Sequence, residues 1–330
     1  MTSREIVQRT LAFRSPERIA MSLPPPYPDD FCFAGIGPDP AHPETDWRQV
    51  GPGRWERTDE WGNTWARLEG FSKGEVCRGS LEDRDRLDRI GLPDYSLPER
   101  YDGARRTFAA SPDRFRVAFL PGFPFTIARY MRRMENFLMD VCAEPDRTAR
   151  LLGMAEEQLH HAIRRLADAG ADAVMFAEDW GTQDRLLVSP ELWWRMFRPG
   201  FGRLCRTAHE RGLFVIMHSC GYIREAMDGM LEAGIDTFQF DQPELYGIDR
   251  LADEFGGRAT FWCPVDIQKT LQTRDAAQIE AAARKMIERF SSCGGGFIAG
   301  YYGSNEAIGL EPQWQDIACR AFVKYGGGRT

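Results

Sequence analysis

The chain has 330 residues, of which 43% are hydrophobic and 28% charged, and its formal net charge is −7. This length suits one large domain or two ordinary ones. The sequence has no basic tract, which excludes a nucleic-acid-binding footprint, and no run of about 18 apolar residues that would predict a membrane helix. The charged N-terminus lacks the apolar segment of a secretory signal, so the eight cysteines are expected to be reduced thiols in a cytoplasmic protein.

Residues 1–110 contain two predicted elements and otherwise few clear signals. A charged amphipathic helix is expected at residues 3–13, before the turn-rich segment PPPYPDD. Aromatic and β-branched residues flank Gly62-Asn63 in the segment GRWERTDEWGNTWARLEG, which predicts a β-hairpin. No linker-like stretch and no change of composition marks a domain boundary.

From about residue 116 onward, short apolar runs alternate with helical patterns. The runs are RVAFLPG, DAVMFAEDWG, LFVIMHSCG, DTFQFDQ, ATFWCPVD and GFIAGYY. A long helix is predicted at residues 146–169, and another opens at Ser189-Pro190, a sound pair of N-cap and first helical residue. This alternation predicts a parallel sheet covered by helices.

An open doubly wound sheet and a closed (β/α)₈ barrel both fit this alternation. No Gly-rich phosphate loop follows any run, so the usual signature of a dinucleotide-binding sheet is missing. Polar residues instead follow strand after strand, and a barrel would bring them to one mouth, where barrel enzymes keep their chemistry. These residues are Glu178, Asp179, His218, Cys220, Asp241, Gln242, Asp266, Gln268, Tyr301, Tyr302 and Asn305. We therefore predict a (β/α)₈ TIM barrel as a single domain over residues 1–330, with an N-terminal extension and the first barrel elements in 1–110 and regular βα repeats in 111–330.

His218 and Cys220 follow the apolar run at residues 214–217 and lie two positions apart. Such side chains on an extended segment point the same way. Imidazole and thiolate suit Zn²⁺, which a catalytic site holds with three protein ligands and one open position. The alternative is a helix-capping histidine beside a small buried cysteine, and the spacing alone leaves both interpretations open. Glu178 is the best-placed third ligand by strand position, and Asp179 is the next.

The carboxylates at the strand ends also have interpretations without a metal. In a cleft, one of the adjacent pair Glu178 and Asp179 can keep its proton and act as an acid, or one can cap the following turn. Asp241 likewise has two interpretations, one in substrate orientation and one in turn capping. Trp180 has helical spacing with other aromatic residues and is expected in the core, with a place in the pocket wall as the alternative.

Several segments, taken in order, resemble the uroporphyrinogen decarboxylase superfamily, in particular its corrinoid-linked methyltransferase branch. The resemblance covers nearly the whole chain. It is carried by MTSREIVQRTLAFRSPERIAMSLP, TDEWGNTWARLEG, PFTIARYMRRMENFLMD, MFAEDWGTQ, VIMHSCGYIREAMDGMLEAGIDTFQFDQPE, FWCPVDIQKTL and GGGFIAGYYGSN. It implies a (β/α)₈ barrel with its active site at the C-terminal mouth, in agreement with the polar strand ends.

The resemblance also distinguishes two branches of the superfamily. True decarboxylases carry an Arg-rich N-terminal segment for the porphyrinogen carboxylates, whereas FCFAGIGPDP, which stands roughly in that place, has no arginine, so porphyrinogen decarboxylation is disfavoured. The methyltransferase branch has His-x-Cys-Gly after a strand, which implies the metal role for His218 and Cys220. Coenzyme M methyltransferases add a cysteine after the final strand. Here Tyr302 or Gly303 stands in that place, and Glu178 is expected to complete the zinc site instead.

The expected function is zinc-dependent methyl transfer. Zn²⁺ held by Glu178, His218 and Cys220 would act as a Lewis acid, and a methyl group would move between a small substrate and a corrinoid (cobalamin) carried by a separate protein. The substrate is expected to be a methyl ether, a methylamine-type compound or a thiol, with O-demethylation as one form of the reaction. The other expected catalytic residues are Asp179, Tyr302 and Asp241, and the expected substrate contacts are Trp180, Gln242, Asp266 and Asn305.

One alternative function and several choices stay open at this point. The alternative is a metal-free decarboxylase of a small carboxylic acid, in which Asp179 or Asp241 would hold a cationic intermediate. The direction of methyl transfer and the choice among corrinoid, thiol and folate as acceptor are undecided. A homodimer is expected from the resemblance alone.

Overall fold

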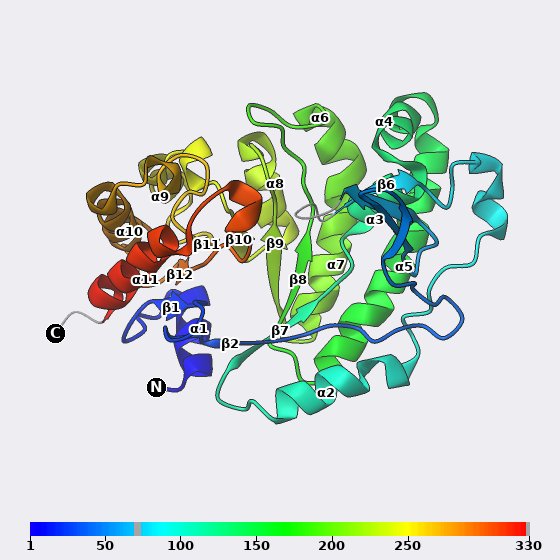
Figure 1. Cartoon of the computed structure of the whole chain (residues 1–330). Helices are drawn as coiled ribbons and strands as arrows, with labels where there is room; N and C mark the ends of the chain where they lie inside the picture. Colours follow the sequence, from blue (N-terminus) through cyan, green and yellow to red (C-terminus); the bar gives the residue numbers. More distant parts are fainter. Residues whose placement is uncertain (69–73, 328–330) are drawn as a thin grey trace.

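A computed structural model describes residues 1–68 and 74–327. Eight parallel strands form a nearly closed barrel with helices on its outside (Figure 1), so the predicted (β/α)₈ fold is confirmed. In spatial order the strands are β1 (Ala20–Met21), β12 (Phe297–Ala299), β11 (Thr260–Cys263), β10 (Thr237–Gln239), β9 (Phe214–His218), β8 (Ala173–Ala177), β7 (Phe115–Phe119) and β2 (Phe31–Ala34). Residues 22–30 connect the two outermost strands, and there Asp30 N donates to Met21 O at 2.8 Å.

Helices follow the strands, as the alternating pattern predicts. The predicted helix at 146–169 is α5 (Pro145–Asp168). The helix expected from Ser189 is built of α6 (Pro190–Leu192), a π-helical segment labelled η3 (Trp193–Phe197) and α7 (Arg198–Glu210). The remaining helices are α2 (Asp102–Ala109), α3 (Pro124–Arg132), α4 (Met134–Ala143), α8 (Arg224–Ala233), α9 (Ile248–Phe255), α10 (Ala276–Phe290) and α11 (Pro312–Gly326), with 3₁₀ turns at Arg84–Arg89, Pro98–Tyr101, Pro243–Leu245, Leu271–Thr273 and Glu306–Ile308. Within the described ranges, no helix is both long and apolar enough to cross a bilayer.

The N-terminal end of the barrel is closed by α1 (Ser3–Leu11), which agrees with the helix predicted at 3–13. This helix begins with a capping box, because Glu5 N donates to Thr2 Oγ1 at 3.2 Å and Thr2 N donates to Glu5 Oε2 at 2.8 Å. Its buried residues Ile6 and Val7 pack with the inward-facing side chains of the strands. Side chains therefore fill the barrel at the amino ends of its strands, and a cavity opens toward the carboxyl ends.

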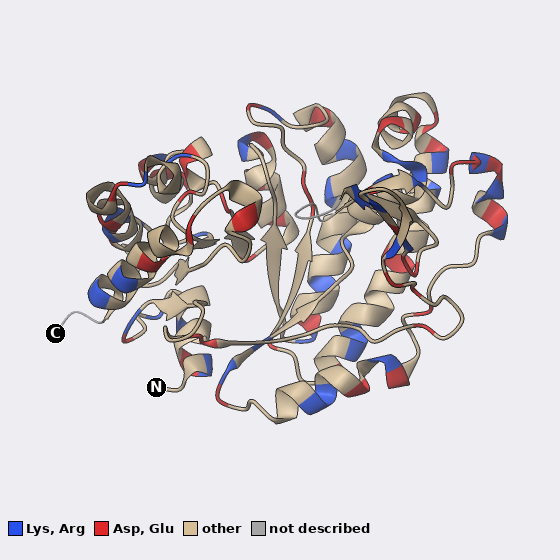
Figure 2. Cartoon of the chain, viewed as in Figure 1, with Lys and Arg blue, Asp and Glu red and all other residues tan. Residues whose placement is uncertain are grey.

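Successive side chains on each strand belong to two different cores, as strand geometry requires. On β8, Ala173 joins the core inside the barrel, whereas Val174 and Phe176 join the core beneath the helices. Charged residues lie mainly on the helices and loops, whereas the barrel strands contain few of them (Figure 2). The position of a residue in this alternation decides whether its side chain can reach the mouth.

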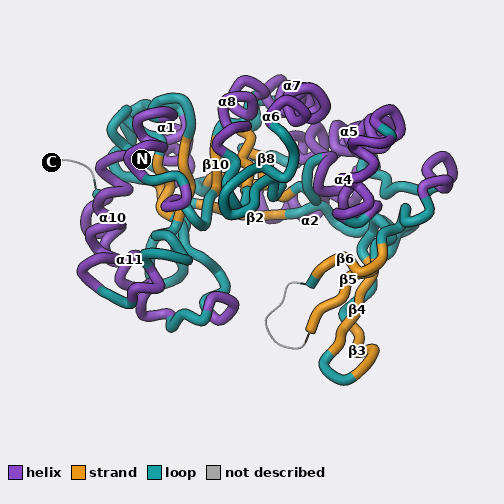
Figure 3. Tube along the Cα trace, turned by 90° about the horizontal axis from the view of Figure 1, so that it is seen from above, coloured by secondary structure: helices purple, strands orange, loops and turns teal. Residues whose placement is uncertain are grey.

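A four-stranded antiparallel sheet lies beside the barrel and projects away from it (Figure 3). It contains β3 (Arg48–Gly51), β4 (Arg54–Thr58), β5 (Thr64–Leu68) and β6 (Glu75–Arg78). The predicted hairpin is confirmed as β4 and β5, joined by a turn in which Gly62 N donates to Asp59 O at 2.9 Å. The last two residues of the predicted hairpin segment, 69–70, lie outside the described residues.

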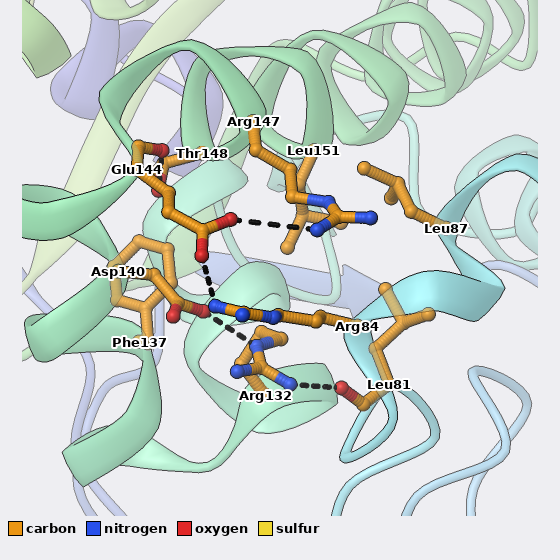
Figure 4. Close-up of a pocket in the computed structure, with 10 residues that line it drawn as sticks. All are labelled: Leu81, Arg84, Leu87, Arg132, Phe137, Asp140, Glu144, Arg147, Thr148 and Leu151. Carbon is orange, nitrogen blue, oxygen red and sulfur yellow. Dashed lines mark hydrogen bonds and ion pairs between the residues drawn. The ribbon is translucent and has the colours of Figure 1, made fainter.

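An ionic junction fixes the chain after this sheet to Arg132 on α3 and to Glu144, which lies between α4 and α5 (Figure 4). Arg132 donates to Asp140 Oδ2 at 2.6 Å and to Glu82 O at 2.8 Å, and Glu144 accepts from both Arg84 and Arg147. The space enclosed by these groups is about 20 Å³. That volume holds little more than one water molecule, so this junction is a packing contact and not a ligand site.

Candidate active site

Asp179, His218 and Cys220 come together at the barrel mouth, and one potential ligand atom from each lies within 4.8 Å of the others. His218 is the last residue of β9, and Asp179 and Cys220 each lie two residues beyond the end of β8 and β9. Nε2 of His218 lies 3.3 Å from Cys220 Sγ and 3.8 Å from Asp179 Oδ1. The sulfur and the imidazole therefore converge, as their spacing in the sequence predicts.

These separations fit a tetrahedral zinc site. Zn–N distances of about 2.0–2.1 Å and a Zn–S distance of about 2.3 Å place two tetrahedral ligand atoms roughly 3.4–3.6 Å apart. The two measured separations, 3.3 and 3.8 Å, lie on either side of this range. One nitrogen, one sulfur and one carboxylate oxygen would leave a fourth position open toward the cavity, which is the arrangement of a catalytic zinc.

Backbone geometry explains why this motif ends in glycine. Gly221 has φ +74°, and a Cβ at that position would lie 2.2 Å from the carbonyl oxygen of Gly181. The loops after β8 and β9 therefore touch through their backbones, and Tyr222 N donates to Thr182 O at 2.7 Å. This contact brings Asp179 and Cys220 together, and Cys220 N donates to Asp179 Oδ1 at 2.8 Å.

Gln239 orients the imidazole, and the sequence did not single it out. It is the register partner of His218 on the adjacent strand β10, and its Oε1 contacts His218 Nδ1. Asp241 Oδ1 accepts from Gln239 Nε2 at 2.8 Å. Because an ionised carboxylate can only accept, this contact turns the amide oxygen toward His218 and makes Nδ1 the protonated nitrogen. The lone pair of Nε2 then faces Cys220 and Asp179, as a metal ligand requires.

Glu178, the expected third ligand, lies outside this group of side chains. It is completely buried on the other side of the strand, where its oxygens accept from Thr126 N at 3.0 Å and from Trp180 Nε1 at 2.9 Å. Burial raises the pKa of Glu178 to about 8, although these hydrogen bonds and the charge of Arg129 oppose the rise. Since Thr126 is in the first turn of α3, Glu178 acts as a cap for that helix. The carboxylate of the cluster is that of Asp179.

Arg129 is a second neighbour of the site. Its Nη2 lies 3.8 Å from Asp179 Oδ2, and its guanidinium stacks on the ring of Tyr130 at 4.9 Å. The side chain is only 12% exposed, so its positive charge is poorly screened by solvent. It balances the acidic side chains behind the cluster.

The cluster opens into a cavity of about 460 Å³ inside the barrel mouth. Its polar wall contains His218, Cys220, Gln239, Asp241 and Tyr302. Its apolar wall consists of aromatic and aliphatic side chains from β2, β7, β8 and β11 and the residues after them. Among the described residues that line it, none is lysine or arginine.

Tyr302 borders the same cavity as the sulfur of Cys220. Burial raises the pKa of Tyr302 above its usual 10, and the charges of Asp241 and Cys220 add to the rise. Its hydroxyl therefore stays protonated at neutral pH. The structure thus places the predicted catalytic residues Tyr302 and Asp241 in the cavity wall and Asp179 in the cluster beside it.

The four predicted substrate contacts have packing or capping positions instead. Trp180 is fully buried and stacks on Phe125 with ring centroids 3.8 Å apart, so the core interpretation holds for it. Asp266 is also buried, and its carboxylate accepts from backbone N–H groups of residues 244, 268 and 269. Asn305 bonds to Tyr301 and Gln315, and Gln242 is buried. None of the four belongs to the described wall of the cavity.

Comparison with known proteins identifies the family. Residues 72–305 match the sequence model of the family described as uroporphyrinogen decarboxylase (URO-D). The chain belongs to this family. The URO-D match covers β7 to β12 and therefore includes every strand that contributes to the cluster.

Two curated URO-D relatives and one solved structure are similar to parts of the chain. Uroporphyrinogen decarboxylases from Bordetella pertussis (strain Tohama I) and Bordetella parapertussis (strain 12822) are each 31% identical over 120 residues, which is 34% of this chain and 34% of the relative. The chain thus matches about a third of the length of these relatives. A methyltransferase from Methanosarcina mazei superposes with a TM-score of 0.55 at 18% identity, over 80% of this chain and 73% of that one. This likeness supports the fold.

Proposed function

We propose that this URO-D family protein is a zinc-dependent methyltransferase of the corrinoid-linked branch, which moves a methyl group between a small substrate and a corrinoid protein. The observation that carries the proposal is the convergence of Asp179, His218 and Cys220 beside an open cavity. A nitrogen, a sulfur and a carboxylate oxygen at these separations match the ligand preferences of zinc.

The composition of the cavity wall argues against porphyrinogen decarboxylation. A porphyrinogen carries eight carboxylates, and such a substrate needs cationic partners. Among the described wall residues there is no lysine or arginine, whereas Asp241 adds negative charge. A metal-free decarboxylase of a smaller acid is the second candidate, because the curated relatives with 31% identity are named decarboxylases.

A zinc ion held by Asp179, His218 and Cys220 would supply a Lewis acid for the heteroatom that carries the methyl group. In such a transfer the carbon–heteroatom bond would break, its electron pair would stay on the heteroatom, and a cobalt(I) corrinoid would take the methyl group. Tyr302 keeps a proton on its hydroxyl oxygen at neutral pH and can donate it to the leaving heteroatom. Gln239 and Asp241 hold the His218 ring in the orientation that leaves Nε2 unprotonated.

Metal analysis and a methyl-transfer assay test the proposal together. We expect one zinc per chain in the purified protein, loss of that zinc in Cys220→Ser, and methylation of a cobalt(I) corrinoid in the presence of a methyl donor. Control experiments use Cys142→Ser, because Cys142 is also exposed but is not in the cluster. A metal-free preparation that decarboxylates a small acid at full rate would establish the second candidate instead.

A further inference from the structure

Two large apolar side chains are exposed at the barrel mouth. Phe33 on β2 is 37% exposed and Phe119 on β7 is 44% exposed, and both line the cavity. Each lies two residues beyond an inward-facing residue of its strand, Phe31 and Val117, so both point into the barrel. Exposed aromatic surface in a concave wall is the usual mark of a site for an apolar ligand.

The aromatic side chains in this wall form a row of nearly parallel rings. The centroids of Phe33 and Phe119 are 5.5 Å apart with an interplanar angle of 16°, and those of Phe33 and Trp262 are 6.2 Å apart at 27°. Phe31 continues the row below Trp262 at 4.5 Å and 21°. A further ring can extend such a row by offset stacking.

The charge and shape of the wall limit which substituents a bound aromatic ligand can have. Because no lysine or arginine occurs among its described residues, the wall offers no lysine or arginine charge to pair with a carboxylate or a phosphate. A quaternary ammonium group is held best where ring faces converge around it. Here neighbouring ring planes differ by at most 27°, so their faces do not enclose a cation. An uncharged planar ring fits both features.

The row of aromatic rings and the cluster of Asp179, His218 and Cys220 lie at a similar height in the barrel. Trp262 is the register partner of Gln239, and Gln239 is the register partner of His218. Two strand spacings of about 4.8 Å therefore separate the Trp262 and His218 backbones, roughly 10 Å in all. A ring stacked on the row can thus direct a short substituent toward the cluster, and a cavity of about 460 Å³ has space for a substituted benzene.

We propose that Phe33, Phe119 and Trp262 form an aryl subsite, and that the methyl-bearing substrate is an uncharged aromatic compound of the methoxybenzene type and not methanol, a methylamine or an alkyl thiol. This inference rests on the proposed function for the transfer step. In that step the aryl-oxygen keeps the electron pair of the broken O–CH₃ bond and takes a proton, while the methyl group leaves to the cobalt(I) corrinoid.

Ligand binding tests the subsite without any methyl transfer. Calorimetry with methoxybenzene and with phenol as probes should detect binding to the purified protein. We expect roughly tenfold weaker binding of both probes to Phe119→Leu and unchanged binding to Phe119→Tyr, which keeps the ring. Met139→Ala is the matched control, because Met139 is an exposed apolar residue on α4 outside the cavity.

Three outcomes separate this inference from the proposed function. Equal binding of the probes to wild type and Phe119→Leu, or tighter binding of tetramethylammonium than of methoxybenzene, would overturn the aryl subsite. Methyl transfer from methanol without any binding of the aromatic probes would overturn the subsite and keep the methyltransferase. Aromatic binding that depends on the Phe119 ring, with no transfer from any donor, would support the subsite and remove the proposed function. Melting curves of each variant exclude unfolding as the cause.

Discussion

The two adjacent carboxylates after β8 give the sharpest test of the proposed metal site. Asp179→Asn and Glu178→Gln each replace a carboxylate by the amide of the same shape, one residue apart. Asp179 Oδ1 lies 3.8 Å from His218 Nε2 and accepts from Cys220 N, whereas Glu178 is completely buried against Thr126 and Trp180. Only the first substitution should change zinc binding directly.

The size of the effect follows from the number of ligands. Structural zinc peptides bind with roughly 10–16 kcal/mol of apparent free energy through four protein ligands, or roughly 2.5–4 kcal/mol for each ligand. Loss of the Asp179 carboxylate should therefore weaken zinc affinity about 60-fold or more, since each 1.4 kcal/mol is a factor of about ten. Glu178→Gln should change the zinc affinity by less than about threefold, because Glu178 is not in the cluster. The amide nitrogen of this variant cannot accept the hydrogen bond that one Glu178 oxygen accepts, so the cost should appear in the melting temperature instead.

Competition with a chromophoric chelator measures both affinities in the same buffer. The Glu178 variant also serves as the control for general damage near the cluster, with melting temperatures of both variants recorded in metal-free protein. Equal losses in the two variants would mean that the backbone of this loop, and not the Asp179 carboxylate, governs zinc binding. A larger loss in Glu178→Gln would require β8 to present its other face to the metal and would refute the ligand set.

Three further substitutions test other contacts. Gln239→Leu removes the acceptor for the Nδ1 proton of His218 and should reduce zinc affinity about 10–100-fold in the chelator titration. Tyr302→Phe should lower the rate of methyl transfer about 10²–10⁴-fold while zinc content is unchanged, if its hydroxyl is the proton donor. Burial alone would raise the pKa of Asp172, but hydrogen bonds from Arg116 and Arg4 outweigh it and hold the pKa below the usual 3.8. The stabilisation by the ionised carboxylate is therefore present above pH 3.8 and is lost as the pH falls through the folded-state pKa. Asp172→Asn should lower the free energy of unfolding in denaturant by about 2–4 kcal/mol at pH 7 and by progressively less at lower pH. A loss that does not vary with pH would contradict this account.

The barrel could be predicted from the sequence because its signals are local. Apolar runs such as β8 and β9 are short and followed by polar residues, and the long helix α5 is strongly periodic, so its predicted and observed ends differ by one residue. The hairpin was found because Gly62 marks its turn. Each of these patterns depends on neighbours in the chain and not on distant contacts.

The aromatic wall could not be predicted for the opposite reason. β1 contains two residues and β2 contains four, which is too short for any periodic signal. Phe33 and Phe119 face each other because β2 and β7 pair in parallel across more than 80 residues of chain. The orientation of Gln239 likewise depends on the register between two strands, which no local pattern contains.

The choice between Glu178 and Asp179, however, was available from the sequence through the alternation of side chains. Inward-facing residues of β8 are 173, 175 and 177, so the next inward position is Asp179, and Glu178 must face the helices. The same alternation places His218 with Cys220. Position in the alternation, and not acidity or closeness to the strand end, decides which carboxylate joins the cluster.

Three adjacent strands contribute to the site in the same way. Ala177, His218 and Gln239 are register partners across β8, β9 and β10, and the residues two positions further on are Asp179, Cys220 and Asp241. The first layer contains the imidazole and the amide that orients it. The second layer contains the two other ligand candidates and the carboxylate that fixes the amide. The small side chain of Ala177 keeps the first layer open, because a larger residue there would project into the cavity that Ala177 and His218 both line.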